Sequence, residues 1–169
     1  MAAVTMAATA TFADPLTERL AAFVRGIGID VRAASLPKKT FLPGLEISHG
    51  AILVDPARLA HPGDLLHEAG HLAVTDPAER NAPTLAPSPG DELTAIAWSY
   101  AALRQLGLDP AVVFHTDGYK GGAESIIENF TAGHYFGVPL LQAYGMSCEP
   151  RQAAAKGVPP YPHMLRWLR

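Results

Sequence analysis

The chain has 169 residues, of which 49% are hydrophobic and 17% charged, a balance typical of one folded domain with a sizeable core. The net charge of -3 and the scattered basic residues exclude recognition of nucleic acid by charge. Apolar stretches are interrupted before the roughly 18 residues that a membrane span requires, and the single cysteine, Cys148, excludes an intrachain disulfide. We therefore expect a protein of a reducing compartment, the cytoplasm, without a membrane segment.

The N-terminal residues 1–13 are rich in Ala and Thr but have neither the basic start nor the Leu- and Val-rich centre of a signal peptide. We expect them to form a disordered tail. Residues 14–169 should form a single domain, because no internal repeat or second boundary interrupts them. Asp14-Pro15 is a helix-capping residue followed by a proline suited to the first helical turn, and the helix is predicted to end near Gly26.

Three short strands are predicted next. Apolar and polar side chains alternate over residues 29–32, the pattern of a half-buried strand. Two further strands are predicted over residues 45–48 and 51–54, with His49-Gly50 between them. Together these segments indicate a small sheet, which we expect to be antiparallel.

Helices are predicted to follow the sheet. His61-Pro62-Gly63-Asp64 provides turn and capping residues for a largely apolar helix over about residues 62–74. Prolines exclude regular structure from residues 76–89, after which Ser88-Pro89-Gly90-Asp91 resembles an N-terminal cap. The helix that begins at this cap is expected to end at Gly107.

The rest of the chain carries fewer signals. Helices are predicted over residues 110–115 and 123–132, and the proline-rich stretch of residues 148–169 gives no clear element. The order of elements indicates the α+β class. We expect a small antiparallel sheet packed on the helix of residues 62–74 and on the helix after it.

One five-residue motif on a predicted helix, His67-Glu68-Ala69-Gly70-His71, has the spacing of a metal clamp. Residues four apart lie one turn above each other, so the imidazoles of His67 and His71 project from one face and can share an ion. Glu68 lies about 100° around the helix from His67, where its carboxylate can take a proton from a metal-bound water without binding the metal. Zinc lowers the pKa of such a water to about 7 and is the predicted cofactor. The two histidines could instead be buried structural residues.

A catalytic zinc site needs a third protein ligand and an open position. Glu92 is the leading candidate, because it lies in the first turn of a helix that can pack antiparallel to the motif helix and direct the carboxylate at the ion. Asp91 is the alternative ligand, and Glu92 could instead interact only with the helix dipole. The less favoured candidates are Asp76, His115, Glu124 and Glu128.

The motif helix, a loop and a helix that begins with a glutamate resemble the gluzincin group of zinc metallopeptidases. The strand-to-helix connection into Leu65-Leu66-His67-Glu68-Ala69-Gly70-His71 is particularly similar to the compact members called minigluzincins and to metallopeptidase domains of the ImmA/IrrE type. The resemblance covers about residues 45–105. It implies a zincin-like fold with Glu68 as the base and three zinc ligands, which are His67, His71 and Glu92.

The sequence departs from the longer gluzincin pattern at Ile96, where many members have an aspartate that orients the first histidine. The group that supports His67 must then come from elsewhere, and Asp64, Asp91 or a backbone carbonyl are the candidates. The metzincin extension is also missing, because no Gly-x-x-His follows His71 at the required spacing.

A glycine-rich loop, His115-Thr116-Asp117-Gly118-Tyr119-Lys120-Gly121-Gly122, is suited to a mobile edge of an active site. His115 or Tyr119 could stabilise the oxyanion of a tetrahedral intermediate and are the further catalytic candidates. Glu124 and Glu128 on the next helix are expected to face solvent. The remaining histidines have no paired spacing and are expected to be structural or surface residues, namely His49, His61, His134 and His163.

The leading functional hypothesis is a zinc-dependent hydrolase, specifically a metallopeptidase that acts on a peptide or protein substrate. The first alternative is a non-catalytic or regulatory metal-binding domain with a zincin-like fold. Two further alternatives are a metal hydrolase that acts on a non-peptide bond and a protein without a metal. No sequence pattern specifies an oligomeric state.

Overall fold

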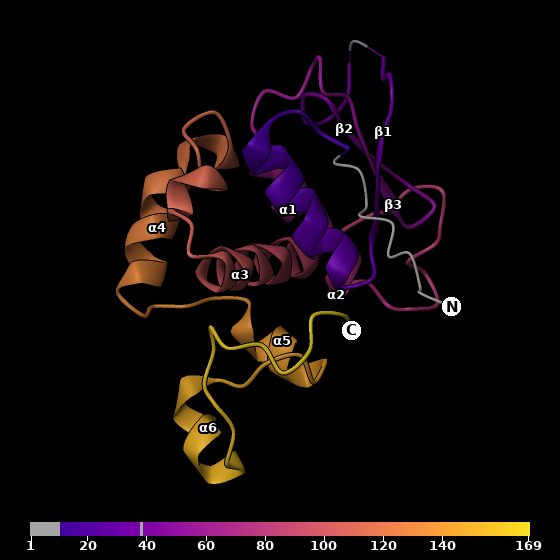
Figure 1. Ribbon diagram of the computed structural model, residues 1–169. Helices are drawn as coiled ribbons and strands as arrows, with labels where there is room; N and C mark the ends of the chain where they lie inside the picture. The colour runs from indigo at the N-terminus through magenta and orange to yellow at the C-terminus, as the bar shows by residue number, and fades with distance from the viewer. Residues whose placement is uncertain (1–10, 38) are drawn as a thin grey trace, which may run out of the picture.

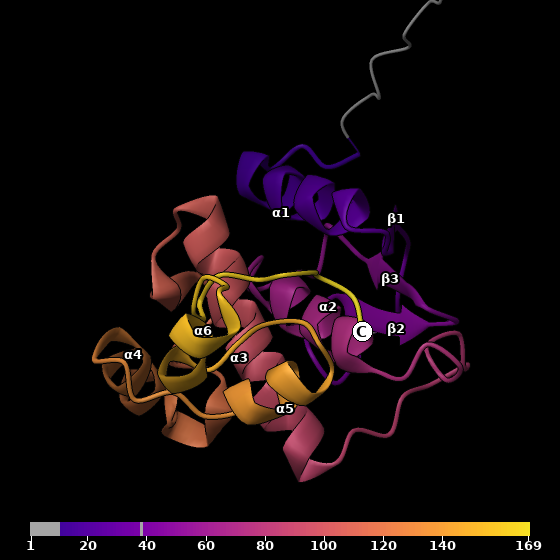
Figure 2. The same cartoon turned by 90° about the horizontal axis from the view of Figure 1, so that it is seen from below.

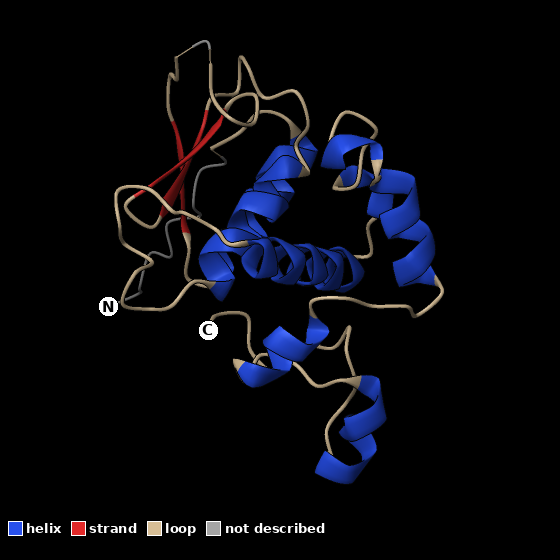
Figure 3. Ribbon diagram, turned by 180° about the vertical axis from the view of Figure 1, so that it is seen from behind, coloured by secondary structure: helices blue, strands red, loops and turns tan. Residues whose placement is uncertain are grey.

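The computed structural model describes residues 11–37 and 39–169. In these residues the fold is α+β, with six α-helices and one sheet of three strands. The elements are α1 (Pro15–Gly26), β1 (Asp30–Ala33), β2 (Leu45–Ser48), β3 (Ala51–Val54), α2 (Asp64–Val74), α3 (Pro89–Leu106), the 3-10 helices η1 (Pro110–Val112) and η2 (Tyr119–Gly121), α4 (Ala123–Thr131), α5 (Val138–Ala143) and α6 (Pro150–Lys156). The sheet lies on one side of the α2–α3 pair and α4 on the other (Figure 1 and Figure 3). Among the described helices, none combines the length and hydrophobicity needed to cross a membrane.

The tail expected at residues 1–13 falls outside the described residues as far as residue 10. In the part that is described, the backbone N–H groups of Thr11 and Phe12 donate to the carboxylate of Glu18 at 3.0 and 2.9 Å. The side chain of Phe12 is buried in the hydrophobic core. Ordered structure therefore begins before the predicted domain boundary at residue 14.

The sheet has the strand order β1-β3-β2, with β3 in the centre. The predicted antiparallel arrangement is correct for β2 and β3, which pair Ile47 with Ile52. It is wrong for β1 and β3, which are parallel and pair Val31 with Ile52. After β1 the chain first forms β2 at the other edge of the sheet and then turns back through the hairpin into β3. The central strand β3 therefore runs in the same direction as β1. His49 and Gly50, with φ of 49° and 77°, form the tight hairpin turn between β2 and β3.

Two of the three N-terminal helix caps predicted from short sequence signals are confirmed. At the start of α1 the Asp14 carboxylate accepts a hydrogen bond of 2.8 Å from the N–H of Thr17. At the start of α3, Ser88 and Asp91 form a reciprocal capping box. This box fixes the first turn of α3, which also carries the candidate ligand Glu92.

Two helix predictions need correction, and two short helices were not predicted. The helix expected from residue 62 begins at Asp64, with Gly63 as its cap residue and no side-chain cap hydrogen bond. Residues 110–115 form only the short helix η1, because the turn residues His115-Thr116-Asp117-Gly118 follow at once. The helices α5 and α6 occupy stretches where no element was predicted. Each spans about two turns or fewer, too short for apolar periodicity to be recognised.

The packing of α2 on α3 is the most extensive contact between elements of the described chain. Gly70 permits it, because a Cβ at this position would lie 2.9 Å from the carbonyl oxygen of Ala95 and 3.3 Å from the hydroxyl of Ser99. The C-terminal segment, residues 157–169, is attached to α3 by a hydrogen bond of 3.0 Å from Trp98 Nε1 to the carbonyl of Trp167. Figure 2 shows this segment, in yellow, running beside α3 and α5.

We expect Gly70→Ala to destabilise the protein. The methyl group gains about 1 kcal/mol of helix propensity, but it forces α3 away from α2, and overpacking of this kind costs about 1–3 kcal/mol. Gly26→Ala is the matched control, because a Cβ at Gly26 meets no atom within 4 Å. Urea unfolding followed by circular dichroism measures the difference. A Gly70→Ala protein as stable as Gly26→Ala would show that the two helices do not need the glycine.

Candidate metal centre

The two motif histidines and Glu92 converge between α2 and α3. The Nε2 atoms of His67 and His71 lie 3.1 Å apart, and their ring planes cross at 89°. Glu92 places one carboxylate oxygen 3.3 Å from His67 Nε2 and the other 2.9 Å from His71 Nε2. These three side chains, called the trio below, could hold a metal ion.

The spacing of the donor atoms fits a tetrahedral ion such as zinc. Tetrahedral bonds of about 2.0–2.1 Å place the ligand atoms about 3.3 Å apart. The two Nε2 atoms are 3.1 Å apart, and each of them lies 2.9–3.3 Å from a different oxygen of Glu92. The histidine side chains are 9% and 8% exposed, whereas that of Glu92 is 43% exposed. The trio therefore opens to solvent on the α3 side, as a site with a free coordination position requires.

The protonation states of the trio suit cation binding. Burial, and then the neighbouring His71, lower the pKa of His67 from 6.5 to about 4, so its imidazole is neutral at neutral pH. The hydrogen bond from His71 lowers the pKa of Glu92 below its ordinary value, so its carboxylate is charged. Metal ligands must be deprotonated to bind, and His67 and Glu92 meet this requirement.

Glu68, the predicted base, is partly buried on α2. It lines a cavity of about 250 Å³ together with Leu45 and Ile47 of β2. Burial is the main cause that raises the pKa of Glu68 to about 7, and the charge of His71 opposes it. A carboxyl group with a pKa near 7 can take up and release a proton at neutral pH. A cation held by the adjacent histidines would lower this pKa.

Tyr119 supports the first histidine of the motif. Its hydroxyl lies 3.2 Å from His67 Nδ1, the ring nitrogen that faces away from the trio. Burial raises the pKa of Tyr119 far above its ordinary value, so the phenol stays protonated. Tyr119 and Lys120 have φ of 58° and 53°, a left-handed conformation that is uncommon outside glycine and persists where the surrounding structure enforces it. A strained turn thus presents the Tyr119 hydroxyl to His67.

The groups expected to support His67 have other partners. The Asp91 carboxylate accepts hydrogen bonds of 2.8 Å from the backbone N–H and the hydroxyl of Ser88, so it caps α3. The Asp64 carboxylate lies 2.7 Å from Nε2 of His115, which therefore reaches Asp64 and not the trio. The less favoured ligands belong to no metal-binding group with the trio in the described residues, and these are Asp76, Glu124 and Glu128.

Two contacts of this region were missed because they have no signature in the sequence. The Asp64–His115 and His67–Tyr119 contacts join residues 51 and 52 positions apart. Helical and strand periodicity cannot reach across such separations. The glycine-rich composition of residues 115–122 was the one available signal, and it indicated the loop but not its partners.

Cavities border the trio on two sides. One, of about 710 Å³, is lined by His67 and Glu92 together with apolar side chains that include Leu93 and Phe136. Another, of about 580 Å³, is lined by His71 and by the proline-rich loop between α2 and α3. Each of the two cavities therefore reaches part of the trio.

Comparisons of the chain with protein-family models, with curated proteins and with solved structures found no match. A functional assignment therefore depends on the geometry and chemistry of the site itself.

We expect Glu92→Ala to weaken zinc retention far more than Asp91→Ala. Both changes remove one carboxylate from the first turn of α3, but Glu92 contacts both motif histidines, whereas Asp91 caps the helix. The loss for Glu92→Ala should exceed the roughly 10–100-fold cost of removing a group that only supports a ligand. Zinc affinity measured by competition with a chelator tests this. The reverse order of the two variants would reassign the third ligand to Asp91.

We expect Tyr119→Phe to lower zinc affinity by about 10–100-fold, because His67 loses the hydroxyl that orients its ring. Tyr144→Phe is the control, since Tyr144 is the C-cap of α5 and lies outside the site. The same chelator competition measures both proteins. Equal affinities would show that the His67–Tyr119 contact does not support the metal.

Proposed function

We propose that this protein is a zinc-dependent hydrolase, specifically a metallopeptidase in which α2 and α3 have a zincin-like arrangement. The observation that carries the proposal is the convergence of His67, His71 and Glu92, with Glu68 beside the first histidine on the same helix. The donor set and its spacing agree with a catalytic zinc site.

The residues of the chain divide the chemistry among them. Zinc, when bound by the trio, acts as a Lewis acid that polarises a carbonyl group and lowers the pKa of water to about 7. Glu68 accepts a proton from the attacking water as the water oxygen bonds to the amide carbon. Glu68 then delivers this proton to the leaving nitrogen as the carbon–nitrogen bond breaks. Tyr119 holds His67 in the orientation that its ligand role requires.

The surroundings of the trio support a peptide substrate. The cavities on its two sides give room for chain on both sides of the cleaved bond. Apolar side chains line much of the larger cavity, and Phe41 at this cavity is 96% exposed. Apolar peptide side chains could be buried there, which contributes binding free energy.

One observation favours a second candidate function, a metal-binding domain without catalysis. Glu68 lines the cavity of about 250 Å³ beside β2, and it is absent from the lining of the larger cavity that His67 and Glu92 share. A substrate confined to the larger cavity would not meet the base.

Glu68→Gln separates the two functions, because it keeps the shape of the side chain and removes the base. A metallopeptidase should keep about one zinc at the trio and lose about 10²–10⁴-fold in turnover, the usual contribution of a general base. Fluorogenic casein is the substrate and metal analysis the second readout. Glu46→Gln is the matched control, since Glu46 lines the same cavity but is exposed. Unchanged turnover in Glu68→Gln would exclude this role, and a wild-type protein with zinc but no turnover would favour the second function.

A further inference from the structure

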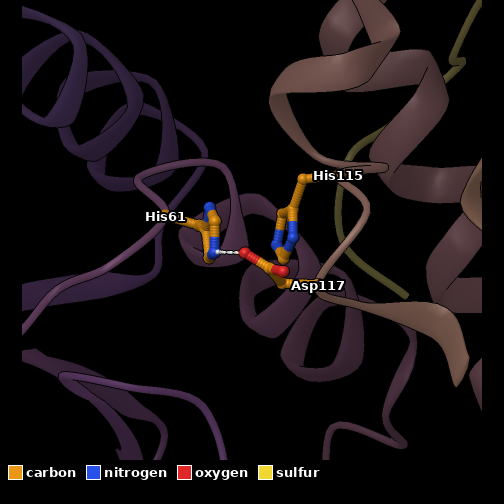
Figure 4. A group of neighbouring side chains, drawn as sticks. All are labelled: His61, His115 and Asp117. Carbon is orange, nitrogen blue, oxygen red and sulfur yellow. Dashed lines mark ion pairs between the residues drawn. The ribbon is translucent and has the colours of Figure 1, made fainter. Parts of the chain in front are cut away.

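A second group of metal-binding side chains lies near the trio. His61 precedes α2, His115 and Asp117 follow η1, and each offers one donor atom within 4.8 Å of the others. His61 Nε2 lies 3.0 Å from a carboxylate oxygen of Asp117. The rings of His61 and His115 are stacked, with centroids 3.6 Å apart and planes inclined by 12°. Figure 4 shows the Asp117 carboxylate beneath the two rings.

The chain crossing at Gly63 brings these residues together. The carbonyl oxygen of Val112 packs directly on Gly63, and a Cβ at this position would overlap with it. This close approach holds the segment after η1 against the start of α2. His61 and His115 therefore meet although they are distant in the sequence.

His115 is oriented as metal-binding histidines are. Its Nε2 lies 2.7 Å from Asp64, and the two side chains are 13% and 5% exposed. Metal-binding histidines typically donate the other ring N–H to a carboxylate, which fixes the tautomer and leaves the second nitrogen free to bind. Nδ1 of His115 is buried and has no hydrogen-bond partner in the described structure, and the same is true of Asp64 Oδ2. His115 Nδ1 is thus a buried nitrogen atom that is free to bind a metal ion.

The charges around the group favour a cation. In the part of the chain that the structure describes, Asp117 forms an ion pair only with His61, and Asp64 only with His115. No Lys or Arg there forms an ion pair with either carboxylate. Two carboxylates facing two imidazoles leave a local excess of negative charge whenever the imidazoles are neutral. A divalent ion would balance this excess.

We propose that His61, His115 and Asp117 form a second metal site, distinct from the trio, for a divalent transition-metal ion such as Zn²⁺ or Co²⁺. Two imidazole nitrogens and one carboxylate oxygen favour such ions over Mg²⁺ and Ca²⁺. A shared ion lies in the plane of each imidazole, so His61 turns out of the stack on binding. The side chains of His61 and Asp117 are 30% and 74% exposed, which permits this movement and gives the ion access from solvent.

The second site borders the larger cavity. Asp64 and Asp117 line this cavity together with His67 and Glu92 of the trio. An ion at the second site would therefore add positive charge at the rim of the same space. The two sites share no ligand, so each can be removed without the other.

Equilibrium dialysis of the untagged, metal-free, full-length protein against Co²⁺, followed by elemental analysis, counts the ions per chain. We expect two ions for wild type, one for His61→Gln and one for Asp117→Asn. His134→Gln is the matched control and should keep two, because His134 is exposed and belongs to neither metal-binding group. Glu92→Ala should lose the ion of the trio and retain the second.

The proposal is overturned if His61→Gln and Asp117→Asn each bind as many ions as wild type. A different result follows if the trio does not bind a metal ion. Wild type then binds a single ion, which His61→Gln loses and Glu92→Ala keeps. Circular dichroism verifies the fold of each variant. If His61→Gln does not fold, Asp117→Asn decides, because the Asp117 side chain is 74% exposed.

Discussion

The packing of α2 on α3 fixes the distance between the histidines of one helix and the glutamate of the next. Gly70, next to His71 in the sequence, lies where α3 approaches so closely that a Cβ would crowd the carbonyl oxygen of Ala95. Protein interiors are close-packed and respond to the addition of a single methyl group, so the separation of the two helices is narrowly determined. A shift of α3 by one ångström would change the separation of Glu92 from both histidines, which is why the helix contact and the site cannot be altered independently.

The same packing determines the electrostatics of the region. Burial keeps His67 neutral and raises the pKa of Glu68 to about 7. In the described structure the buried polar side-chain atoms without a partner are His71 Nδ1, Asp64 Oδ2 and His115 Nδ1. Each such atom costs about 1–3 kcal/mol. All three belong to, or contact, the two groups that could hold a cation, and His115 Nδ1 is the one among them that an ion at the second group would contact directly.

Features decided by near neighbours could be predicted from the sequence. The caps at Asp14 and Ser88 and the turn at His49-Gly50 depend on a few adjacent residues. The convergence of His67 and His71 follows from helical spacing alone. Glu92 joined them because α3 packs on α2, which the apolar faces of both helices favour.

Features decided by distant segments could not be predicted. The direction of β1 depends on how the chain passes around the sheet before β3 forms, and no local pattern records that path. The support of His67 by Tyr119 depends on a strained turn in the loop after η1. The sequence indicates a flexible loop there, whereas the tertiary structure enforces one conformation. The His61–His115 stack likewise requires the crossing at Gly63.

The attachment of the C-terminal segment can be followed by the intrinsic fluorescence of the protein. The chain has 2 tryptophans, and both lie in one aromatic cluster, where the rings of Trp98 and Trp167 are 5.4 Å apart and Phe23 of α1 contacts each. Intrinsic fluorescence therefore reports whether the C-terminal segment is seated against α1 and α3. A change of emission at constant helix content would mean that this segment had separated while α2 and α3 stayed folded, so the two parts of the molecule can be followed separately in one unfolding experiment.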